Sequence, residues 1–557
     1  MTARGSFDRD AALRRLVDDR FDVLVVGGGV TGAGVALDAA SRGLRTALIE
    51  RDDFAAGTSS RSSKLIHGGL RYLQSGDVRL VYEALAERQH LRRNAPHLVK
   101  VLPFLIPVFA GRDGGVSKKV ARALGSAMWM YDLTGGARIG KLHQRISADE
   151  AVERMPTLRR ERLAGAYLYY DAQADDARLT LTIARTAALD FGAVVVNGAE
   201  VVGLVKGDGG RVVGATIAAG GDPVDVAAAV VVNATGVWSD DVRALDEGRH
   251  PASIRPAKGV HVSVPWAKIR NTAAVVVPVP GETRSVFVVP WGDVTYIGTT
   301  YTDYDGPLYD PQCTPDDVDY VLRAINSAIT TPITTADVVG TWAGLRPLVR
   351  SDHGGRAAHR GRTADLSRRH RVARSAGGMV TVTGGKLTTY REMAADTVDE
   401  VVSLLSDDLL RRAGRSRTKR LALRGADGYD DMVAVDRHLA GRYGGEARTV
   451  LAMVRRDPDL GRPLVPNLPY LRAEAVYGAR YEMARSLDDV LSRRTRARLL
   501  AREASAGAAA DVAALVGPVL GWDDAEQARR VADYRASVAR ERTSAGLPDA
   551  AGAAVGA

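Results

Sequence analysis

The chain has very little cysteine and no long apolar run. Cys313 is the only cysteine among 557 residues, which excludes an internal disulfide and a cysteine-rich metal cluster. The longest apolar stretch, 101–110, contains two prolines and falls short of the roughly 18 apolar residues of a membrane-spanning helix. The first 20 residues lack the apolar core of a secretory signal. We therefore expect no metal site and no membrane span, and a reducing, cytoplasmic location is permitted.

The chain has fewer acidic than basic residues. Lysine and arginine together number 76 against 66 acidic residues, a net charge of +10. Such a balance favours nucleic acid, acidic lipid or phosphorylated metabolites as partners. The arginines are scattered without interleaved aromatic residues, so we predict no nucleic-acid binding. A chain of this length is too long for one core and predicts two or three domains.

Glycine is concentrated where an apolar run at 21–26 ends. Gly27, Gly29 and Gly32 follow it at the spacing G-x-G-x-x-G, and the run itself has the pattern of a parallel strand buried on both faces. The first glycine permits a tight turn, the second lets a pyrophosphate approach the backbone, and the third lets the next helix pack closely on the strand. The start of that helix offers N–H groups and a positive dipole end to a diphosphate. The segment predicts a dinucleotide-binding turn.

An acidic residue ends the second predicted strand, at 46–49. Glu50 lies about 20 residues beyond the glycine turn, where a carboxylate binds the ribose diol of an unphosphorylated adenosine. A glycine motif alone is often only a turn, but strand, helix, strand and carboxylate stand here in register.

A longer signature identifies the dinucleotide. Residues 58–73, Thr-Ser-Ser-Arg-Ser-Ser-Lys-Leu-Ile-His-Gly-Gly-Leu-Arg-Tyr-Leu, resemble the signature of the FAD-dependent, aerobic (respiratory) glycerol-3-phosphate dehydrogenases. The resemblance continues through 232–236, 288–291, 297–300, 344–348 and 384–391. It covers about residues 20–400 closely and the remainder more loosely. It implies FAD as cofactor and oxidation of sn-glycerol 3-phosphate to dihydroxyacetone phosphate, with electrons passed to a quinone.

The implied fold class is α/β. A Rossmann-type FAD-binding domain is interleaved with an antiparallel-sheet substrate domain and followed by a C-terminal helical domain. Apolar runs predict a buried strand that ends at 233–236, a hairpin formed by 201–205 and 212–217, and antiparallel strands between 250 and 345. The arginines after about residue 405 are expected to form ion pairs on a helical bundle. The expected boundaries are an N-terminal extension at 1–20, the oxidoreductase region at 21–400 with FAD-binding segments at about 21–100, 178–240 and 340–400, the helical domain at 405–543, and a disordered tail at 544–557.

The substrate dictates the groups that its site needs. Glycerol 3-phosphate is a dianion with a secondary alcohol, so it requires fixed cations, a base for the C2 hydroxyl and a flavin N5 to receive hydride. Arginine suits the phosphate because its planar fork makes two contacts at once. The resemblance implies that the substrate is bound by Arg71, Tyr72, Arg346 and Lys386, the last two also serving catalysis. His67 and His261 are the two candidate bases, and either also fits a structural hydrogen-bonding role.

The predicted cofactor site draws on several distant stretches. The glycine turn at 384–385 opens a helix whose N–H groups suit the anionic edge of a reduced flavin. The resemblance and the motifs together assign cofactor binding to Gly27, Gly29, Gly32, Glu50, Thr58, Ser59, Ser63, Lys64, Gly236, Gly385, Leu387 and Thr388.

A stretch from 101 to 136 has the composition of an interfacial segment. It combines an apolar run, Lys118 and Lys119, and the aromatic residues Trp129 and Tyr131. We expect it to dock on the inner face of the cell membrane and to bring the flavin near a lipid-soluble quinone; an ordinary core helix and strand is the alternative. The oligomeric state stays open, with a homodimer as one option.

Three other functions share parts of this pattern. A glycerol-3-phosphate oxidase would use oxygen in place of quinone at the same site. A related flavin amine oxidase would lack the phosphate-binding arginines. A non-catalytic flavin-binding or membrane scaffold would hold the cofactor without reducing it.

Overall fold

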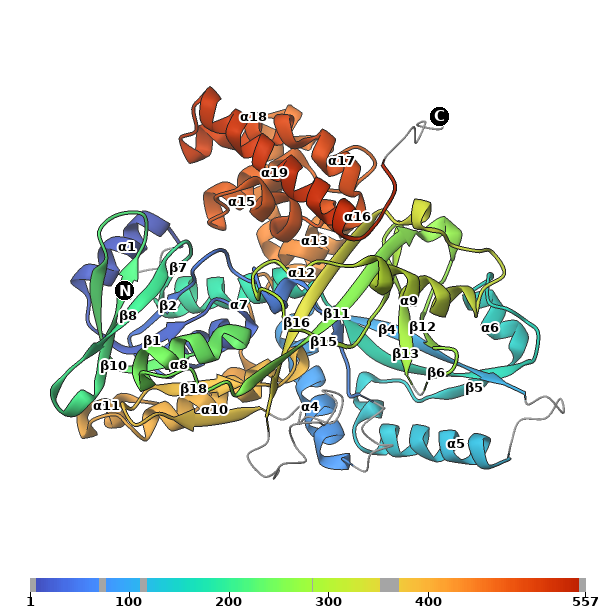
Figure 1. Ribbon diagram of the computed structural model, residues 1–557, viewed down its shortest axis with the longest axis horizontal. Coiled ribbons are helices and arrows are strands. Elements are labelled where there is room, and N and C mark those ends of the chain that lie inside the picture. The colour runs from blue at the N-terminus through green and yellow to red at the C-terminus, as the bar shows by residue number, and fades with distance from the viewer. Residues whose placement is uncertain (1–6, 70–76, 111–117, 283, 351–369, 550–557) are drawn as a thin grey trace.

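The structure, a computed structural model, describes residues 7–69, 77–110, 118–282, 284–350 and 370–549. Two sheets lie side by side, and the C-terminal helices sit above the junction between them (Figure 1). The α/β class, with two interleaved sheets and a C-terminal helical region, is confirmed.

The first sheet is formed by the predicted nucleotide-binding strands. Its central strand β1 (Phe21–Val26) is buried at every position and lies parallel to both of its neighbours. As predicted, β8 (Glu200–Lys206) and β9 (Val212–Ala218) form a hairpin, and β9 also pairs with β10 (Val224–Asn233) of this sheet. Across the sheet the order is β17 (Arg371–Arg374), β18 (Val380–Thr383), β10, β1, β2 (Thr46–Ile49) and β7 (Val194–Val196).

Three helices pack together beside this sheet. Helix α2 (Val30–Ser41) follows the glycine turn and is buried along almost its whole length. It contacts α7 (Asp176–Phe191) and α10 (Tyr390–Val402), which come from distant parts of the chain. The amphipathic N-terminal segment forms α1 (Arg9–Asp18), with Leu16 buried in the core of the same sheet.

The second sheet is mostly antiparallel, as predicted for 250–345. One of its two longest pairings joins β11 (Ile254–Pro265) to β16 (Gly340–Val349), and the other joins β4 (Lys100–Phe109) to β6 (Leu163–Gln173). The order is β15 (Thr302–Asp303), β11, β14 (Val294–Gly298), β13 (Ser285–Trp291), β12 (Ala274–Pro278), β4, β6 and β3 (Leu65–Ile66), with β5 (Gln144–Ile146) paired to β6. Helices α4 (Val78–Asn94), α5 (Lys118–Leu133), α6 (Ala148–Arg154) and α9 (Pro315–Asn326) lie beside it (Figure 1).

The structure divides two of the expected FAD-binding segments between the sheets. Strand β3 from the segment 21–100 and strand β16 from the segment 340–400 both belong to the second sheet. Strand β16 pairs along its whole length with β11, and this pairing is a long-range contact that no local pattern reveals. The chain therefore crosses from the first sheet to the second just after residue 60 and again between β10 and β11. It returns to the first sheet between β6 and β7 and between β16 and β17.

The C-terminal helices enclose a core of their own and are tied to the first sheet by buried ion pairs. Arg494 Nη2 lies 2.7 Å from Asp53 Oδ1, and Arg178 of α7 pairs with Glu482. The arginines thus form ion pairs as expected, but several of their partners belong to the nucleotide-binding part. The helices are α12 (Tyr429–Val433), α13 (Arg437–Tyr443), α14 (Ala447–Arg456), α15 (Arg472–Tyr481), α16 (Ala497–Leu500), α17 (Arg502–Gly507), α18 (Ala509–Leu520) and α19 (Asp524–Ser544). Helix α11 (Asp407–Arg412) lies instead beside α10 at the first sheet (Figure 1).

The start of the expected disordered tail is packed. Ala545 and Leu547 are buried in the core of the second sheet, and Gly546 lies against Pro315. Helix α19 directs them there, since Glu541 Oε1 accepts a hydrogen bond from the Thr341 N–H of β16. The expectation of disorder is therefore wrong for residues 544–547, since Ser544 ends α19 and the next three residues are packed. Residues 550–557 lie outside the described part of the chain.

Gly32 provides a test of the close packing at the start of α2. A Cβ added there would lie 1.8 Å from the Gly27 carbonyl oxygen, so Gly32→Ala forces the glycine turn and the helix apart. We expect this substitution to lower the free energy of unfolding by about 2 kcal/mol or more, measured by urea denaturation.

The matched control is Gly507→Ala in α17, where nothing lies within 4 Å of the added Cβ. We expect Gly507→Ala to leave the unfolding midpoint unchanged or to raise it slightly, because alanine is the better helix former. Equal unfolding midpoints for the two variants would contradict the packing described here.

Candidate functional site

A cavity of about 790 Å³ lies where the two sheets and the C-terminal helices meet. The carboxyl end of β1, the turn after β10 and the turn before α10 all open into it. The carboxyl edge of a parallel sheet is where nucleotide ligands bind in such folds. Three distant motifs line this one cavity: Gly27 and Gly29, Thr235 and Gly236, and residues 384–387.

The glycine turn is built by close approach of the backbone. Gly27 has φ +107°, and a Cβ there would lie 2.8 Å from the Ala234 carbonyl oxygen. At the start of α2, the Val30 N–H donates to Ser59 Oγ at 2.9 Å. The turn thus brings the start of α2, the 58–60 segment and the end of β10 to one place, as a bound diphosphate requires.

Glu50 lies partly buried on the cavity wall beside this turn. Its Oε2 accepts the Gly28 N–H at 2.6 Å and its Oε1 accepts the Asp52 N–H at 2.8 Å. Burial raises the pKa of Glu50 to about 7, although both backbone hydrogen bonds favour its charged form. A ribose diol that donates hydrogen bonds to this carboxylate would favour ionisation.

The segment 58–64 begins on the cavity wall and then runs away from it. Thr58 and Ser59 line it, and the Thr58 hydroxyl donates to the Leu345 carbonyl at 2.6 Å. Ser63 and Lys64 are not among the lining residues. Lys64 Nζ is buried 2.9 Å from Asp176 Oδ1, and burial, with Arg496 nearby, lowers its pKa to about 8. The roles in cofactor binding assigned to Ser63 and Lys64 therefore stay predictions.

Arg346 and Lys386 occupy different positions around the cavity. Leu345 and Pro347 line it from β16, whereas Arg346 between them is directed to the other face of the strand. Its guanidinium donates to Thr299 Oγ1 at 3.0 Å and to the Lys258 carbonyl at 3.3 Å. Lys386 lines the cavity at the start of the turn that leads into α10.

The two candidate histidines lie in different environments. His261 is buried; its Nε2 is 2.9 Å from Ser63 Oγ and its ring stacks on Trp342 with a centroid distance of 4.8 Å. Burial holds the pKa of His261 well below its usual value, and the charges of Lys64 and Arg346 act in the same direction. His67 is only partly buried, and its backbone N–H donates to Thr388 Oγ1 at 3.2 Å.

Two predicted substrate residues, Arg71 and Tyr72, lie outside the described residues. Of the remaining predicted cofactor residues, Gly32 packs on Gly27, Leu387 lines the cavity, and Thr388 contacts His67.

No cluster of three or more histidine, cysteine, aspartate or glutamate side chains suited to a metal ion occurs in the described ranges.

Several residues of the cavity wall were not predicted. The guanidinium of Arg51 lies between two aromatic rings, 5.2 Å from the centroid of Trp238 and 5.7 Å from that of Tyr309. Asp310 Oδ1 lies 3.2 Å from Arg61 and its Oδ2 lies 3.4 Å from Arg540 of α19. The C-terminal helices contribute Arg493, Arg496, Arg498 and Glu541 to the same wall. The only sequence signal for this contribution is the density of arginine at 493–498.

Comparison with protein families divides the chain into two matched regions. Residues 22–391 match the family described as FAD dependent oxidoreductase. Residues 414–527 match the family described as C-terminal domain of alpha-glycerophosphate oxidase.

Individual proteins match over almost the whole chain. A glycerol-3-phosphate dehydrogenase 2 from Mycobacterium tuberculosis is 42% identical over 98% of this chain and 93% of its own length. A mitochondrial glycerol-3-phosphate dehydrogenase from Homo sapiens is 38% identical over 93% of this chain and 73% of its own length. The crystal structure of a glycerol-3-phosphate dehydrogenase from Bacillus halodurans complexed with FAD matches with a TM-score of 0.76 at 30% identity, covering 95% of this chain and 96% of that one.

The raised pKa of Glu50 predicts a pH dependence of stability. An acid whose pKa rises on folding, here from 4.5 to about 7, keeps its proton in the folded chain after the unfolded chain has released it. Stability attributable to Glu50 is therefore greatest below pH 4.5 and is lost as the pH rises to about 7. We expect the free energy of unfolding of the cofactor-free wild type to fall over this range relative to Glu50→Gln, measured in urea at pH 4.5, 5.5, 6.5 and 7.5.

Glu200→Gln removes another carboxylate from the wall of the same cavity and serves as the control. It should follow the wild-type profile. Parallel profiles for wild type and Glu50→Gln would show that this carboxyl does not titrate as described.

Proposed function

Since the chain belongs to the family of FAD-dependent glycerol-3-phosphate dehydrogenases, we propose that it oxidises sn-glycerol 3-phosphate to dihydroxyacetone phosphate and passes the electrons to a quinone. The observation that carries the proposal is the convergence of three distant motifs on one cavity at the carboxyl edge of the first sheet. The near full-length similarity to proteins with this activity supports the substrate.

The cavity residues suit FAD. The glycine turn and the start of α2 would hold the diphosphate, and Glu50 would hold the adenosine ribose. The backbone at 384–387 would face the flavin edge that becomes anionic on reduction. When bound, FAD supplies the N5 atom that accepts hydride from C2 of the substrate.

Arg346 has a guanidinium that is already ordered, and this order supports its proposed role in binding phosphate without a large entropic cost. Its guanidinium is held by the Thr299 hydroxyl and two backbone carbonyls, and it lies 4.8 Å from the ring centroid of Tyr301. A guanidinium already ordered loses little freedom when an anion binds. Lys386, on the cavity side, is the second cation assigned to the substrate, and Arg71 and Tyr72 complete the proposed set.

His67 is the stronger candidate for the base. A base must hold a proton during the reaction, and burial beside Lys64 and Arg346 makes a charged His261 costly. His261 then serves as a neutral partner of Ser63 and Trp342. His67 is less buried and directly contacts the turn that contains Lys386.

Oxygen is the alternative electron acceptor. The match of residues 414–527 to the C-terminal domain of alpha-glycerophosphate oxidase is the observation that favours it. Peroxide formation in air separates an oxidase from a quinone reductase.

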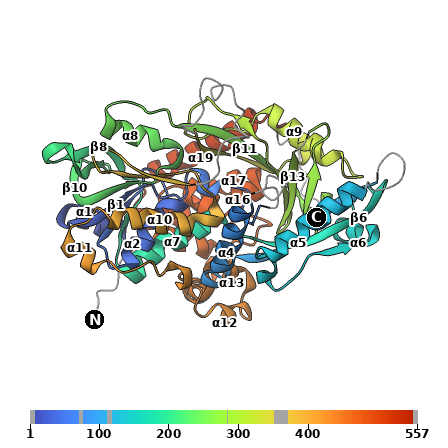
Figure 2. The same ribbon diagram turned by 90° about the horizontal axis from the view of Figure 1, so that it is seen from below.

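We also propose that helix α5 (Lys118–Leu133) docks on the inner surface of the cell membrane. Its end exposes Trp129, Met130 and Leu133, the first at 56% and the last at 82%. Figure 2 shows α5 on the face opposite the C-terminal helices, where no other part of the described chain covers it. Within the described part of the chain, no helix is both long and apolar enough to cross a membrane. The protein would thus be cytoplasmic and peripheral on the membrane.

Anaerobic bleaching of the bound flavin by glycerol 3-phosphate tests the proposed reaction. We expect the absorbance near the flavin maximum to disappear with glycerol 3-phosphate but not with plain glycerol. Arg346→Ala should raise the KM for glycerol 3-phosphate about tenfold or more, because a charged contact to phosphate is lost. Lys386→Ala should chiefly lower turnover.

The matched control is Arg374→Ala, which should behave as wild type. It removes an exposed arginine of β17 that pairs with Glu400 of α10. The site would be refuted by unaltered kinetics in both Arg346→Ala and Lys386→Ala. Bleaching by an amine substrate in place of glycerol 3-phosphate would favour an amine oxidase, and a flavin that no substrate bleaches would favour a scaffold.

Flotation with vesicles tests the membrane proposal. Wild type should float with vesicles of anionic lipid, and Trp129→Glu with Leu133→Glu should remove most of this binding, because each places a charge in the interfacial layer. Val435→Glu changes an equally exposed apolar residue before α13 and should still float. Equal flotation of the α5 variant and the Val435→Glu control would exclude α5 as the docking surface.

A further inference from the structure

The segment His67–Gly68 is held from two opposite sides. On one side, Thr388 Oγ1 accepts the His67 N–H at 3.2 Å and lies 3.4 Å from the His67 carbonyl oxygen. On the other side, the Gly68 N–H donates to the Tyr131 hydroxyl at 3.1 Å, with Asp171 Oδ1 at 3.4 Å. The proposed base therefore lies between the turn at 387–389 and helix α5.

A buried chain of polar groups fixes the second side. The Tyr131 hydroxyl donates to Asp171 Oδ2 at 2.6 Å, and Arg88 Nη1 lies 2.5 Å from Asp171 Oδ1. Arg88 Nη2 also donates to the Gly136 carbonyl at 3.1 Å. Arg88, Tyr131 and Asp171 are each at most 2% exposed. Among the Arg88 nitrogens, Nη1 and Nη2 are hydrogen-bonded and Nε is not. A buried charge pair held by several hydrogen bonds restrains its members.

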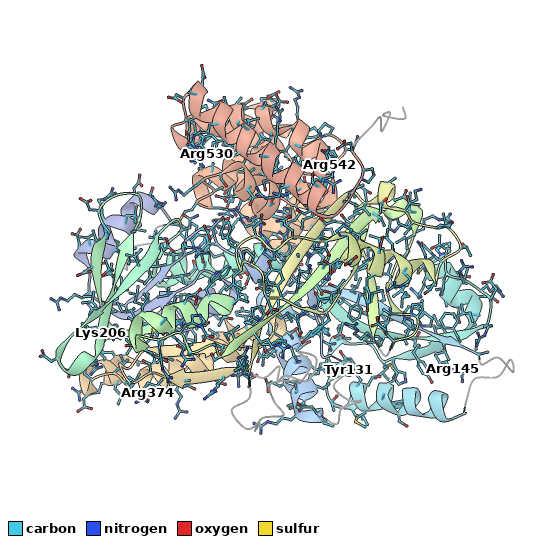
Figure 3. All side chains as sticks on the ribbon, in the orientation of Figure 1. Tyr131, Arg145, Lys206, Arg374, Arg530 and Arg542 are labelled. Atoms are coloured by element: carbon cyan, nitrogen blue, oxygen red, sulfur yellow. The ribbon has the colours of Figure 1, made fainter. Side chains whose placement is uncertain are left out.

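The packing leaves this segment no freedom to move toward α4 or α5. A Cβ on Gly68 would lie 2.5 Å from Leu85 Cδ2 and 2.7 Å from the Tyr131 hydroxyl oxygen. Figure 3 places Tyr131 on the end of α5 that is nearer to α4. Tyr131, Asp171 and Arg88 come from three separate elements, α5, β6 and α4, so the arrangement is a product of the tertiary structure.

We propose that Tyr131, Asp171 and Arg88 are positioning residues for the reaction: together they press His67–Gly68 against Thr388 and so set the place of the His67 imidazole. This inference rests on the proposed function. None of the three belongs to the residues that line the cofactor cavity, so they act on the reaction through His67. Burial, with Asp171 beside it, holds the pKa of Tyr131 well above its usual value, which keeps the hydroxyl protonated as the donor to Asp171.

Tyr131→Phe is the sharpest test, because it removes the bridging hydroxyl and keeps the ring and the Arg88–Asp171 pair. Asp171 is left intact, since its removal would strand the buried Arg88 charge and unfold the region. The measurement is anaerobic stopped-flow reduction of the FAD-loaded enzyme by saturating glycerol 3-phosphate. We expect the rate constant per flavin to fall about tenfold or more, since misplacement of a catalytic group by about 1 Å costs up to about a hundredfold.

Tyr169→Phe is the matched control. Tyr169 is a buried tyrosine whose ring lies 5.7 Å from that of Tyr131. It should retain the wild-type rate constant, and both variants should keep their FAD content and similar thermal midpoints. A purely structural role would reduce the fraction of active enzyme without changing the rate constant per flavin.

A double-mutant cycle tests whether the effect passes through His67. In a His67→Gln background, Tyr131→Phe should change the rate constant less than about twofold. The inference is overturned if Tyr131→Phe reduces flavin as fast as Tyr169→Phe, or if its loss persists undiminished beside His67→Gln. Failure of glycerol 3-phosphate to bleach the wild-type flavin would instead reject the proposed function and this inference with it.

Discussion

Buried carboxylates hold the C-terminal helices onto the nucleotide-binding sheet, and the cavity depends on them. Asp53, three residues after Glu50, accepts hydrogen bonds from Arg493 and Arg494, both at 2.7 Å. Burial alone would raise the pKa of Asp53, but these two arginines hold it below its usual value. Asp176, at the start of α7, is shared by Lys64 and Arg496. Because a buried charge without its partner is strongly destabilising, the sheet and the helices stabilise each other, and the cavity wall they share forms only when both are folded.

The position of the site follows from where the chain changes sheets. The segment 58–67 leaves the cavity edge of the first sheet and becomes β3 of the second, passing Ser63 and Lys64 on the way. The turn at 384–389 follows the last strand of the first sheet and meets that segment again at His67. The proposed dinucleotide-binding groups and the proposed substrate groups are thereby brought near one another where the two sheets meet. This is the arrangement that hydride transfer between two bound molecules requires.

Helix α5 has two faces with different consequences. Tyr131 and Met128 are buried against the second sheet, and Tyr131 takes part in the hydrogen bonds that hold Gly68. Trp129 and Leu133, from the same turns, are exposed to solvent. A helix divided in this way has an apolar surface on its outer face and the Tyr131 hydroxyl on its inner face. The proposed membrane surface and the proposed base are thus supported by the same element.

The sequence alone determined the features that contiguous residues specify: the glycine turn with its flanking strands, the hairpin at 200–218, the antiparallel character of 250–345 and, by resemblance, the cofactor. Each depends on periodicity, turn chemistry or a motif within a few residues. Only the tertiary structure decided the partners of Arg493, Arg494 and Arg496, the assignment of β3 and β16 to the second sheet, the packing of residues 545–547 and the unequal burial of His67 and His261. These outcomes depend on contacts between residues tens to hundreds of positions apart, and the burial that sets a pKa or orients a side chain exists only once those contacts have formed.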